Sequence, residues 1–164
     1  MKFKDIANSI KQLWDNVNSL KSVNILKAII PEDLDLTAIE DYQYIPINLQ
    51  EDTKIGTKLR FSNNKIVIGT GVKYVKLTAN CIIRNSTDTD LFGLVIRKND
   101  TNYVMSYSQI ATAEYGNLSI PSTVCPVEQG DELSLAVYLN HTNNKCVMRQ
   151  YTRSTFLEVD VINS

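Results

Sequence analysis

Hydrophobic and polar residues alternate over much of the chain that follows Tyr42. The longest such run lies between Val72 and Arg84, where every second residue is apolar: Val75, Leu77, Ala79, Cys81 and Ile83. Successive side chains of a β-strand point to opposite faces, so this spacing predicts a strand with one buried face. The same alternation recurs at 132–139 and 157–161.

Shorter strands are expected at 43–49, 65–68, 91–98, 102–108, 114–120 and 145–152. Residues that favour turns separate these runs, among them Ser62-Asn63-Asn64, Asn99-Asp100 and Gly130-Asp131. Eight or nine short strands divided in this way predict a mainly β fold, an antiparallel β-sandwich, rather than a parallel sheet covered by helices.

The first thirty residues follow a helical pattern instead. Their apolar residues are spaced three and four apart: Phe3, Ile6, Ile10, Leu13, Val17 and Leu20. This spacing predicts one amphipathic α-helix within 1–30, with a seam like that of a coiled coil. Three roles remain open for the helix: packing on its own domain, joining copies of the chain, or lying on a membrane surface. If it joins copies, the interface contains Ile10, Leu13, Val17 and Leu20.

Charge divides the chain into three parts. Residues 1–27 carry a net charge of +3, residues 28–52 contain seven acids and no base, and residues 53–164 carry +3. The acidic part contains Pro31 and Pro46, where a helix does not continue. The sequence therefore predicts a helix at 1–30, an acidic connector at 31–42 with one short helical turn at Pro31, and a sandwich at 43–164.

Composition narrows the class of protein. The 164 residues are 43% hydrophobic and 21% charged, which predicts a folded domain with its own core. A net charge of −1 argues against a nucleic-acid partner, and no apolar run reaches the ~18 residues of a membrane span. The N-terminus does not resemble a secretory signal. Three cysteines without CxxC spacing indicate a chain made in a reducing compartment, without a disulfide framework.

Two of the expected strands are apolar on both faces, which is more than a sandwich strand needs. One contains Leu91 and Phe92, and the other contains Phe156, Leu157 and Ile162. A neighbouring protomer is one natural cover for the extra face, and chance placement at the strand ends is the alternative. We therefore hypothesise that Phe92, Phe156 and Ile162 lie in an interface between protomers.

Several strand-and-turn motifs carry a family resemblance. They lie at 56–69, 71–80, 96–99, 119–121, 127–135 and 155–162. Together they resemble the small jelly-roll head domains of bacteriophage tail and baseplate proteins, whose fold is similar to the trimeric C1q/tumour-necrosis-factor-like sandwich. The resemblance covers residues 43–162, and residues 1–30 match no motif of the family.

The resemblance implies a homotrimer, made in the bacterial cytoplasm and carried on a virion, that binds a host cell-surface saccharide or another receptor. It also implies that the N-terminal helix attaches the head to other virion structural proteins. A seam with Ile and Val at a and Leu at d favours two strands over three, so a helix on a trimer would have to follow the sandwich. A structural or decorating virion protein and a lectin-like or hydrolytic bacterial domain remain alternatives.

Candidate chemistry is sparse, and we expect no catalysis, no cofactor and no metal. His141 is the single histidine, lies in a polar stretch, and has no second histidine as a metal-binding partner. No GxSxG elbow, phosphate loop or zinc spacing is present. Cys81 and Cys125 read as core residues, whereas Cys146, next to Lys145, is expected to be the most exposed thiol.

Binding is the better supported activity. Tyrosines recur in the β part, and the expected loops at 85–90, 99–102 and 140–145 are rich in Asn, Asp and Thr. Aromatic faces beside such polar side chains are typical of saccharide and peptide sites. We expect a ligand site between protomers, formed by Tyr103, Tyr107, His141, Asn143, Arg149 and Tyr151.

Overall fold

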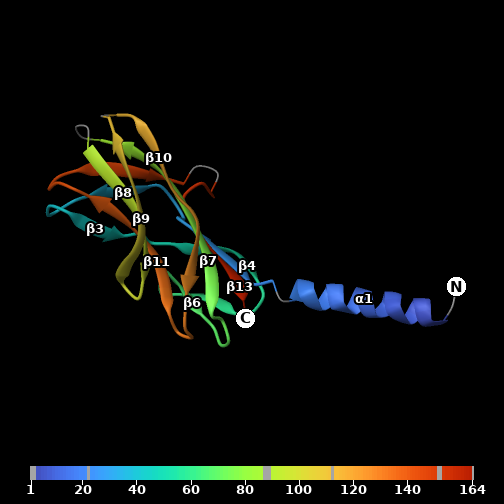
Figure 1. Cartoon of the computed structure of the whole chain (residues 1–164). Helices are drawn as coiled ribbons and strands as arrows, with labels where there is room; N and C mark the ends of the chain where they lie inside the picture. The colour runs from blue at the N-terminus through green and yellow to red at the C-terminus, as the bar shows by residue number, and fades with distance from the viewer. Residues whose placement is uncertain (1–2, 22, 87–89, 112, 151–152, 164) are drawn as a thin grey trace.

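The computed structural model describes residues 3–21, 23–86, 90–111, 113–150 and 153–163, with the side chains of residues 3, 16–21 and 163 left out. In these residues one helix, α1 (Phe3–Lys21), precedes thirteen strands that form two antiparallel sheets packed face to face (Figure 1). The predicted class, a mainly β antiparallel jelly-roll sandwich with an N-terminal helix, is confirmed.

The seven-stranded sheet is built around the long strand β7 (Tyr74–Asn85). On one side β7 pairs with β10 (Tyr115–Pro126). On the other side of β7, residues 74–80 pair with β13 (Phe156–Asn163). Next to β13 in the sheet lie β1 (Ile25–Ile29) and then β4 (Gln50–Ile55). Residues 82–85 of β7 pair with β12 (Lys145–Arg149), and β2 (Leu34–Thr37) lies next to β12 at the edge of the sheet.

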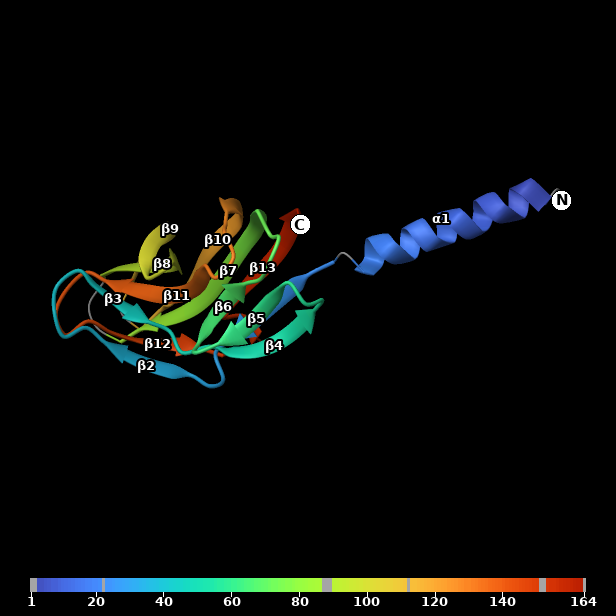
Figure 2. The ribbon, with the colours of Figure 1, turned by 90° about the horizontal axis from the view of Figure 1, so that it is seen from below.

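The six-stranded sheet is built around β11 (Glu132–Leu139). One side of β11 pairs with β8 (Asp90–Lys98), which pairs in turn with the edge strand β9 (Thr101–Ile110). The other side of β11 pairs with β3 (Gln43–Pro46) and with β6 (Lys65–Ile68), and β6 pairs with β5 (Leu59–Ser62). Seen from below, the two sheets are separate layers (Figure 2).

The core fills the space between the sheets. The alternation predicted for β7 is confirmed, because all five of its predicted inward residues are buried. Leu133, Leu135 and Val137 of β11 and Leu157 and Val159 of β13 meet them from the other strands. Burial of this apolar surface, at about 25 cal/mol per Å², is the main force that holds the sheets together.

Phe92 belongs to this core, and the hypothesis that it lies between protomers is wrong. Its side chain is 0% exposed and points between the sheets, with Leu94 and Ile96 of the same strand. The opposite face of β8 is also covered, because Val95 is buried under side chains of its own chain, in a cluster with Ala136, Tyr138, Tyr44 and Leu91. The second apolar face of this strand therefore needs no neighbouring protomer.

The boundaries predicted for the first 42 residues are wrong. The helix ends at Lys21, and Ile25–Ile29 is a strand inside the seven-stranded sheet, with Leu26 and Ala28 buried. The connector contains β2, and no helical turn begins at Pro31. Two observations explain the difference: burial alternates over residues 25–28, as in a strand, and residues 34–37 pair with β12. The sandwich therefore begins near residue 24.

Asn24 fixes the junction between helix and sandwich. Its buried side-chain Oδ1 accepts hydrogen bonds of 2.9 Å from the backbone N–H groups of both Thr57 and Lys58. Its backbone carbonyl accepts another from Val161 N–H. Gly56 lies so close that a Cβ there would meet Asn24 Oδ1 at 2.2 Å. The chain therefore enters the sandwich at a set position.

Helix α1 projects away from the sandwich instead of packing on it (Figures 1 and 2). The described side chains of its apolar seam are exposed, with Ile6 at 40%, Ile10 at 52% and Leu13 at 64%. Trp14, which lies beside this seam in the sequence, is 59% exposed. Among the described residues, no helix is both long enough and apolar enough to cross a membrane. The described side chains of the helix therefore do not pack on its own domain.

Candidate functional site: the outer face of the six-stranded sheet

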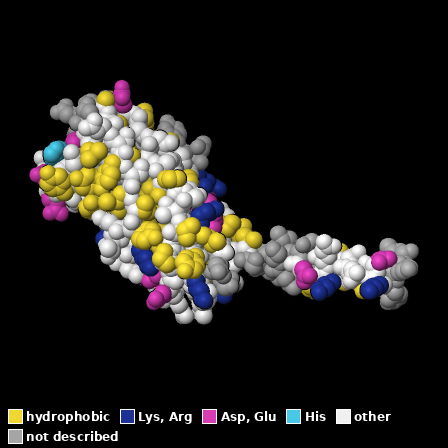
Figure 3. Space-filling model, in the orientation of Figure 1, with side chains coloured by type: hydrophobic (Ala, Val, Ile, Leu, Met, Phe, Trp, Pro, Cys, Tyr) yellow, Lys and Arg dark blue, Asp and Glu magenta, His cyan; other side chains and the backbone are white. Residues whose placement is uncertain are grey.

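Aromatic and polar side chains gather on the face of the six-stranded sheet that points away from the core, which we call the outer face. Strand register arranges this face in three rows across β11, β8 and β9. They are Tyr138–Gly93–Tyr107, then Ala136–Val95–Met105, then Ser134–Arg97–Asn102. Hydrophobic side chains are dense over β3, β8, β9 and β11 in Figure 3, beside the single histidine.

The first row forms a tyrosine cluster, which consists of Tyr44, Tyr107 and Tyr138. The ring centroids of Tyr44 and Tyr138 are 5.1 Å apart, and Tyr107 meets Tyr138 edge to face at 5.5 Å. The Tyr107 hydroxyl donates to Met105 Sδ at 3.0 Å. Tyr138 is nearly buried, whereas Tyr107 is 44% exposed. Contacts of this kind hold Tyr107 in one orientation while leaving much of its ring in solvent.

Two hydroxyls of this cluster, those of Tyr107 and Tyr138, keep their protons. Burial raises the pKa of Tyr107, and a hydrogen bond with Tyr44 adds to the effect. Burial, followed by the neighbouring Tyr44, also raises the pKa of Tyr138. Each group therefore stays a neutral O–H through neutral and mildly alkaline pH, able to donate and accept hydrogen bonds.

Gly93 makes this arrangement possible. A Cβ at this position would lie 2.8 Å from two ring carbons of Tyr107 and 3.0 Å from Tyr138 Cβ. The Tyr107 ring therefore lies directly over the backbone of β8, which only a residue without a side chain allows.

We expect Gly93→Ala to displace the Tyr107 ring and to lower the free energy of unfolding by about 1–3 kcal/mol, because the new methyl overpacks the contact. Denaturant unfolding measures this. A double-mutant cycle with Tyr107→Ala provides the control, since the cost of Gly93→Ala should shrink once the ring is gone. An equal cost in both backgrounds would show that Gly93 does not hold the ring's place.

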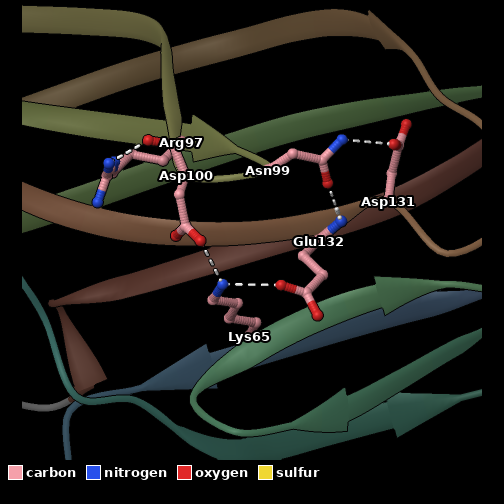
Figure 4. Close-up of polar contacts among 6 residues, drawn as sticks. All are labelled: Lys65, Arg97, Asn99, Asp100, Asp131 and Glu132. Carbon is pink, nitrogen blue, oxygen red and sulfur yellow. Dashed lines mark hydrogen bonds and ion pairs between the residues drawn. The ribbon is translucent and has the colours of Figure 1, made fainter.

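The other end of the outer face is polar. Two hairpin tips meet there, Asn63-Asn64 and Asn99-Asp100, and all four residues have φ between +50° and +62°, as a type I′ turn requires. Lys65 Nζ contacts Asp100 at 2.9 Å and Glu132 at 2.7 Å (Figure 4). These hydrogen bonds, to Glu132 first and then to Asp100, raise the pKa of Lys65, so the ammonium stays charged and paired.

A small cavity of about 130 Å³ lies between these tips, and we call it the Arg97 pocket. Its polar lining consists of Asn48, Asn63, Asn64, Lys65, Arg97, Asp100 and Ser134. Arg97 donates through a terminal nitrogen to the Asp100 carbonyl (Figure 4). Its Nε is buried, and no described residue accepts a hydrogen bond from it. A buried donor without a partner costs about 1–3 kcal/mol, so this atom is a place where a ligand oxygen would be favourable.

The structure does not gather the predicted ligand residues into one site within the protomer. Tyr107 lies in the tyrosine cluster, but Tyr103 on the same strand leans toward β10, where its hydroxyl donates to the Val124 carbonyl at 3.3 Å. A β-bulge between Ile96 and Arg97 shifts the register of β9 next to Tyr103. A hydrogen bond with Cys125, together with burial, raises the pKa of Tyr103.

His141 and Asn143 belong to the loop between β11 and β12, which is fastened to residues 38–42 by backbone bonds, including Asn143 N–H to the Ala38 carbonyl. Thr142 donates to Asp41 through both its N–H and its hydroxyl, which lowers the pKa of Asp41. This loop is held as a structural turn.

Arg149 lies on the seven-stranded sheet. It pairs with Asp33 and donates to the Tyr115 hydroxyl at 3.3 Å. A hydrogen bond from Gln150 N–H, with that of Arg149, lowers the pKa of Asp33 against the effect of burial. Tyr151 lies outside the described residues.

The predicted interface residues have separate outcomes. Ile10 and Leu13 are exposed on the projecting helix, while the side chains of Val17 and Leu20 lie outside the described part of the structure. Ile162 is 53% exposed at the end of β13. The Phe156 ring is half-buried under the Lys27 ammonium, 4.4 Å from its centroid. A role between protomers stays a prediction for these residues.

Cys146 is not the exposed thiol that its basic neighbour suggested. It is 1% exposed, because β12 turns it into the core, and burial raises its pKa to about 12. Cys81 and Cys125 are buried as predicted, and burial raises the pKa of both thiols. Within the described residues, no group of three or more His, Cys, Asp or Glu side chains could hold a metal ion.

Comparison with solved structures identifies the architecture. The chain matches murine APRIL at pH 5.0 with a TM-score of 0.67 over 86% of this chain and 100% of that chain, at 12% identity. The sandwich has a tumour-necrosis-factor jelly-roll fold. Eiger TNF from S. frugiperda matches with a TM-score of 0.63 over 87% of this chain and 94% of that chain, at 8% identity.

No protein-family model matches the sequence, and no curated protein does. At 8–12% identity the structural likeness shows the fold alone. The tumour-necrosis-factor-like part of the family resemblance is therefore confirmed, whereas the bacteriophage part stays a prediction.

Proposed function

We propose that this protein is a homotrimeric head of a bacteriophage tail, fibre or baseplate, which binds a host cell-surface saccharide or another receptor without catalysis. The helix joins the three chains into a stalk and attaches them to other virion proteins. The outer face of each six-stranded sheet binds the receptor. The tumour-necrosis-factor-like fold, the exposed helix and the tyrosine cluster support this proposal.

The observation that carries the proposal is the exposed apolar seam of α1. An isolated helix of 19 residues is marginal in water, and most helices gain stability by burying an apolar face. Here Ile6, Ile10 and Leu13 are exposed on a helix that projects away from the sandwich. Identical helices that pack on one another would bury these side chains together with Trp14.

The position of the helix supports an arrangement in which the seven-stranded sheet faces the other copies. Three residues separate α1 from β1, which lies in the seven-stranded sheet beside β13 and β4. Exposed apolar side chains surround this point: Val23, Ile55, Tyr74 and Ile162. A trimer with its stalk on the axis therefore buries this sheet toward the axis, leaving the outer face of the six-stranded sheet free.

Binding of the labelled full chain to a panel of bacterial cells tests the receptor role. We expect binding to at least one host, and we expect Tyr107→Ala to reduce it at least tenfold. Tyr103→Ala is the matched control, because Tyr103 lies on the same strand with 39% exposure but outside the tyrosine cluster. Binding to virion components and to no cell would indicate a decorating protein, and equal loss in both variants would argue against this face.

A further inference from the structure

We infer that the outer face binds a neutral, extended saccharide of about three rings, which runs from the tyrosine cluster to the Arg97 pocket. This inference rests on the proposed receptor-binding function and names the ligand class and its path. It follows from three properties of the face: its length, the chemistry of its two ends, and its balance of charge.

The length comes from strand register. Tyr138 and Ser134 lie four residues apart on β11, on the same face, and mark the two outer rows. At about 3.3 Å per residue these rows are about 13 Å apart, which matches about three linked pyranose rings. Between them lies the row of Ala136, Val95 and Met105, whose first two side chains are fully buried while Met105 is 40% exposed. Met105 and the side chains that cover Val95 therefore form the surface between the two ends, and the middle row carries no charged side chain.

The tyrosine end suits the apolar face of a sugar ring. Tyr107 offers an exposed ring that is already fixed against Tyr138 and over Gly93, so little conformational entropy is lost on binding. A pyranose presents a flat array of C–H groups on one side and hydroxyls at its edge. The neutral tyrosine O–H groups beside the ring can both donate to and accept from those hydroxyls.

The pocket end suits hydroxyl groups. A cavity of about 130 Å³ accommodates one ring edge, and its lining offers amides from Asn48 and Asn64, the Ser134 hydroxyl and the buried Arg97 Nε. A few convergent polar groups at the end of an apolar surface are typical of small-ligand sites. A ligand oxygen at the Arg97 Nε would satisfy the donor that no described residue accepts.

The charges favour a neutral ligand. The Lys65 ammonium is already paired with Asp100 and Glu132, and the Arg97 guanidinium donates to the backbone carbonyl of Asp100 (Figure 4). Lys65, Arg97 and Asp100 line the pocket, and Glu132 contacts Lys65 from outside the lining. The two basic side chains are thus matched by two acidic ones in this group, with no surplus charge to attract a phosphate or a carboxylate. A neutral saccharide fits this balance better than an anionic one.

An array of linear neutral glycans with one to six rings tests the inference on the full chain. We expect binding to at least one glycan of three or more rings and at least tenfold weaker binding to its one-ring and two-ring fragments. Tyr107→Ala and Arg97→Met should each weaken that binding at least tenfold. Arg97→Lys keeps the positive charge but lacks Nε, and it serves as a second variant in case Arg97→Met does not fold. Tyr103→Ala and Arg60→Met are the controls.

No bound glycan, or binding that neither outer-face substitution weakens, overturns the inference. Periodate and protease treatment of cells that bind the protein separates this failure from failure of the proposed function. Periodate destroys saccharide rings, so loss of cell binding after periodate supports the inference. If Tyr107→Ala abolishes cell binding that resists periodate but not protease, the receptor is a protein. The function then stands and the saccharide does not.

Discussion

Aspartate at both Ile10 and Leu13 is expected to dissociate the protein and unfold its helix. The two charges would lie in the seam where identical helices pack, and burying an unpaired carboxylate costs several kcal/mol. Because a lone helix of this length is marginal, loss of its partners should remove most of the helical signal. Far-ultraviolet circular dichroism at several protein concentrations measures this, with the sandwich signal unchanged.

The matched control is Asn8→Asp with Gln12→Asp, which adds the same charge on the face of α1 opposite the seam. This control should keep the helical signal of the natural chain. If both double variants behave alike, or if the seam variant keeps its helix at low concentration, the helix is stable without copies of itself. The exposed seam would then need another explanation.

Phe92→Ala is expected to lower the free energy of unfolding by about 3–5 kcal/mol, the usual cost of removing a buried Phe from a core. Phe92 is among the largest fully buried side chains of the protein, and no rearrangement of the two sheets can fill the space that it leaves. A loss of this size is a large part of the stability of an ordinary domain. Denaturant unfolding at a fixed protein concentration measures it.

Ile162→Ala is the comparison for Phe92→Ala, since Ile162 is 53% exposed on the same protomer. At concentrations where the chain is dissociated, Ile162→Ala should lower the free energy of unfolding by less than about 1 kcal/mol. The loss should be larger where the chain is assembled, because the Ile162 side chain lies at the proposed interface. A cost for Phe92→Ala that depends on protein concentration would instead place Phe92 between protomers. That result would contradict the structure.

The N-terminal segment shows which features of the fold the sequence pattern predicts and which it does not. Spacings of three and four residues predict the helix correctly, and all residues of the predicted seam lie within Phe3–Lys21. The expected end at residue 30 is wrong, because the run from Ile25 to Ile29 is too short for its alternation to stand out from a helical pattern. What makes it a strand is pairing with β13 and β4, segments far away in sequence. Local sequence propensity does not predict this pairing between distant segments.

The outer face could be predicted only in part, for a similar reason. Tyrosines that recur in the β part indicate an aromatic surface, and Tyr107 was predicted as a ligand residue in this way. Tyr44 and Tyr138 complete the cluster only because β3 pairs with β11, and Gly93 matters only because Tyr107 lies over it. The sequence pattern does not predict the bulge that turns Tyr103 away from the tyrosine cluster. A site built by sheet register becomes visible only once the register is known.

Assembly of three chains is the central feature of the proposed function, and the solution mass of the full chain by light scattering tests it directly. We expect a mass three times that of the 18.5 kDa chain over a broad range of concentrations. A chain beginning at Val23, which keeps every strand, should show a weaker tendency to form the same trimer. A monomer at all concentrations would contradict the account, and a dimer would show that the helical seam alone sets the number of chains.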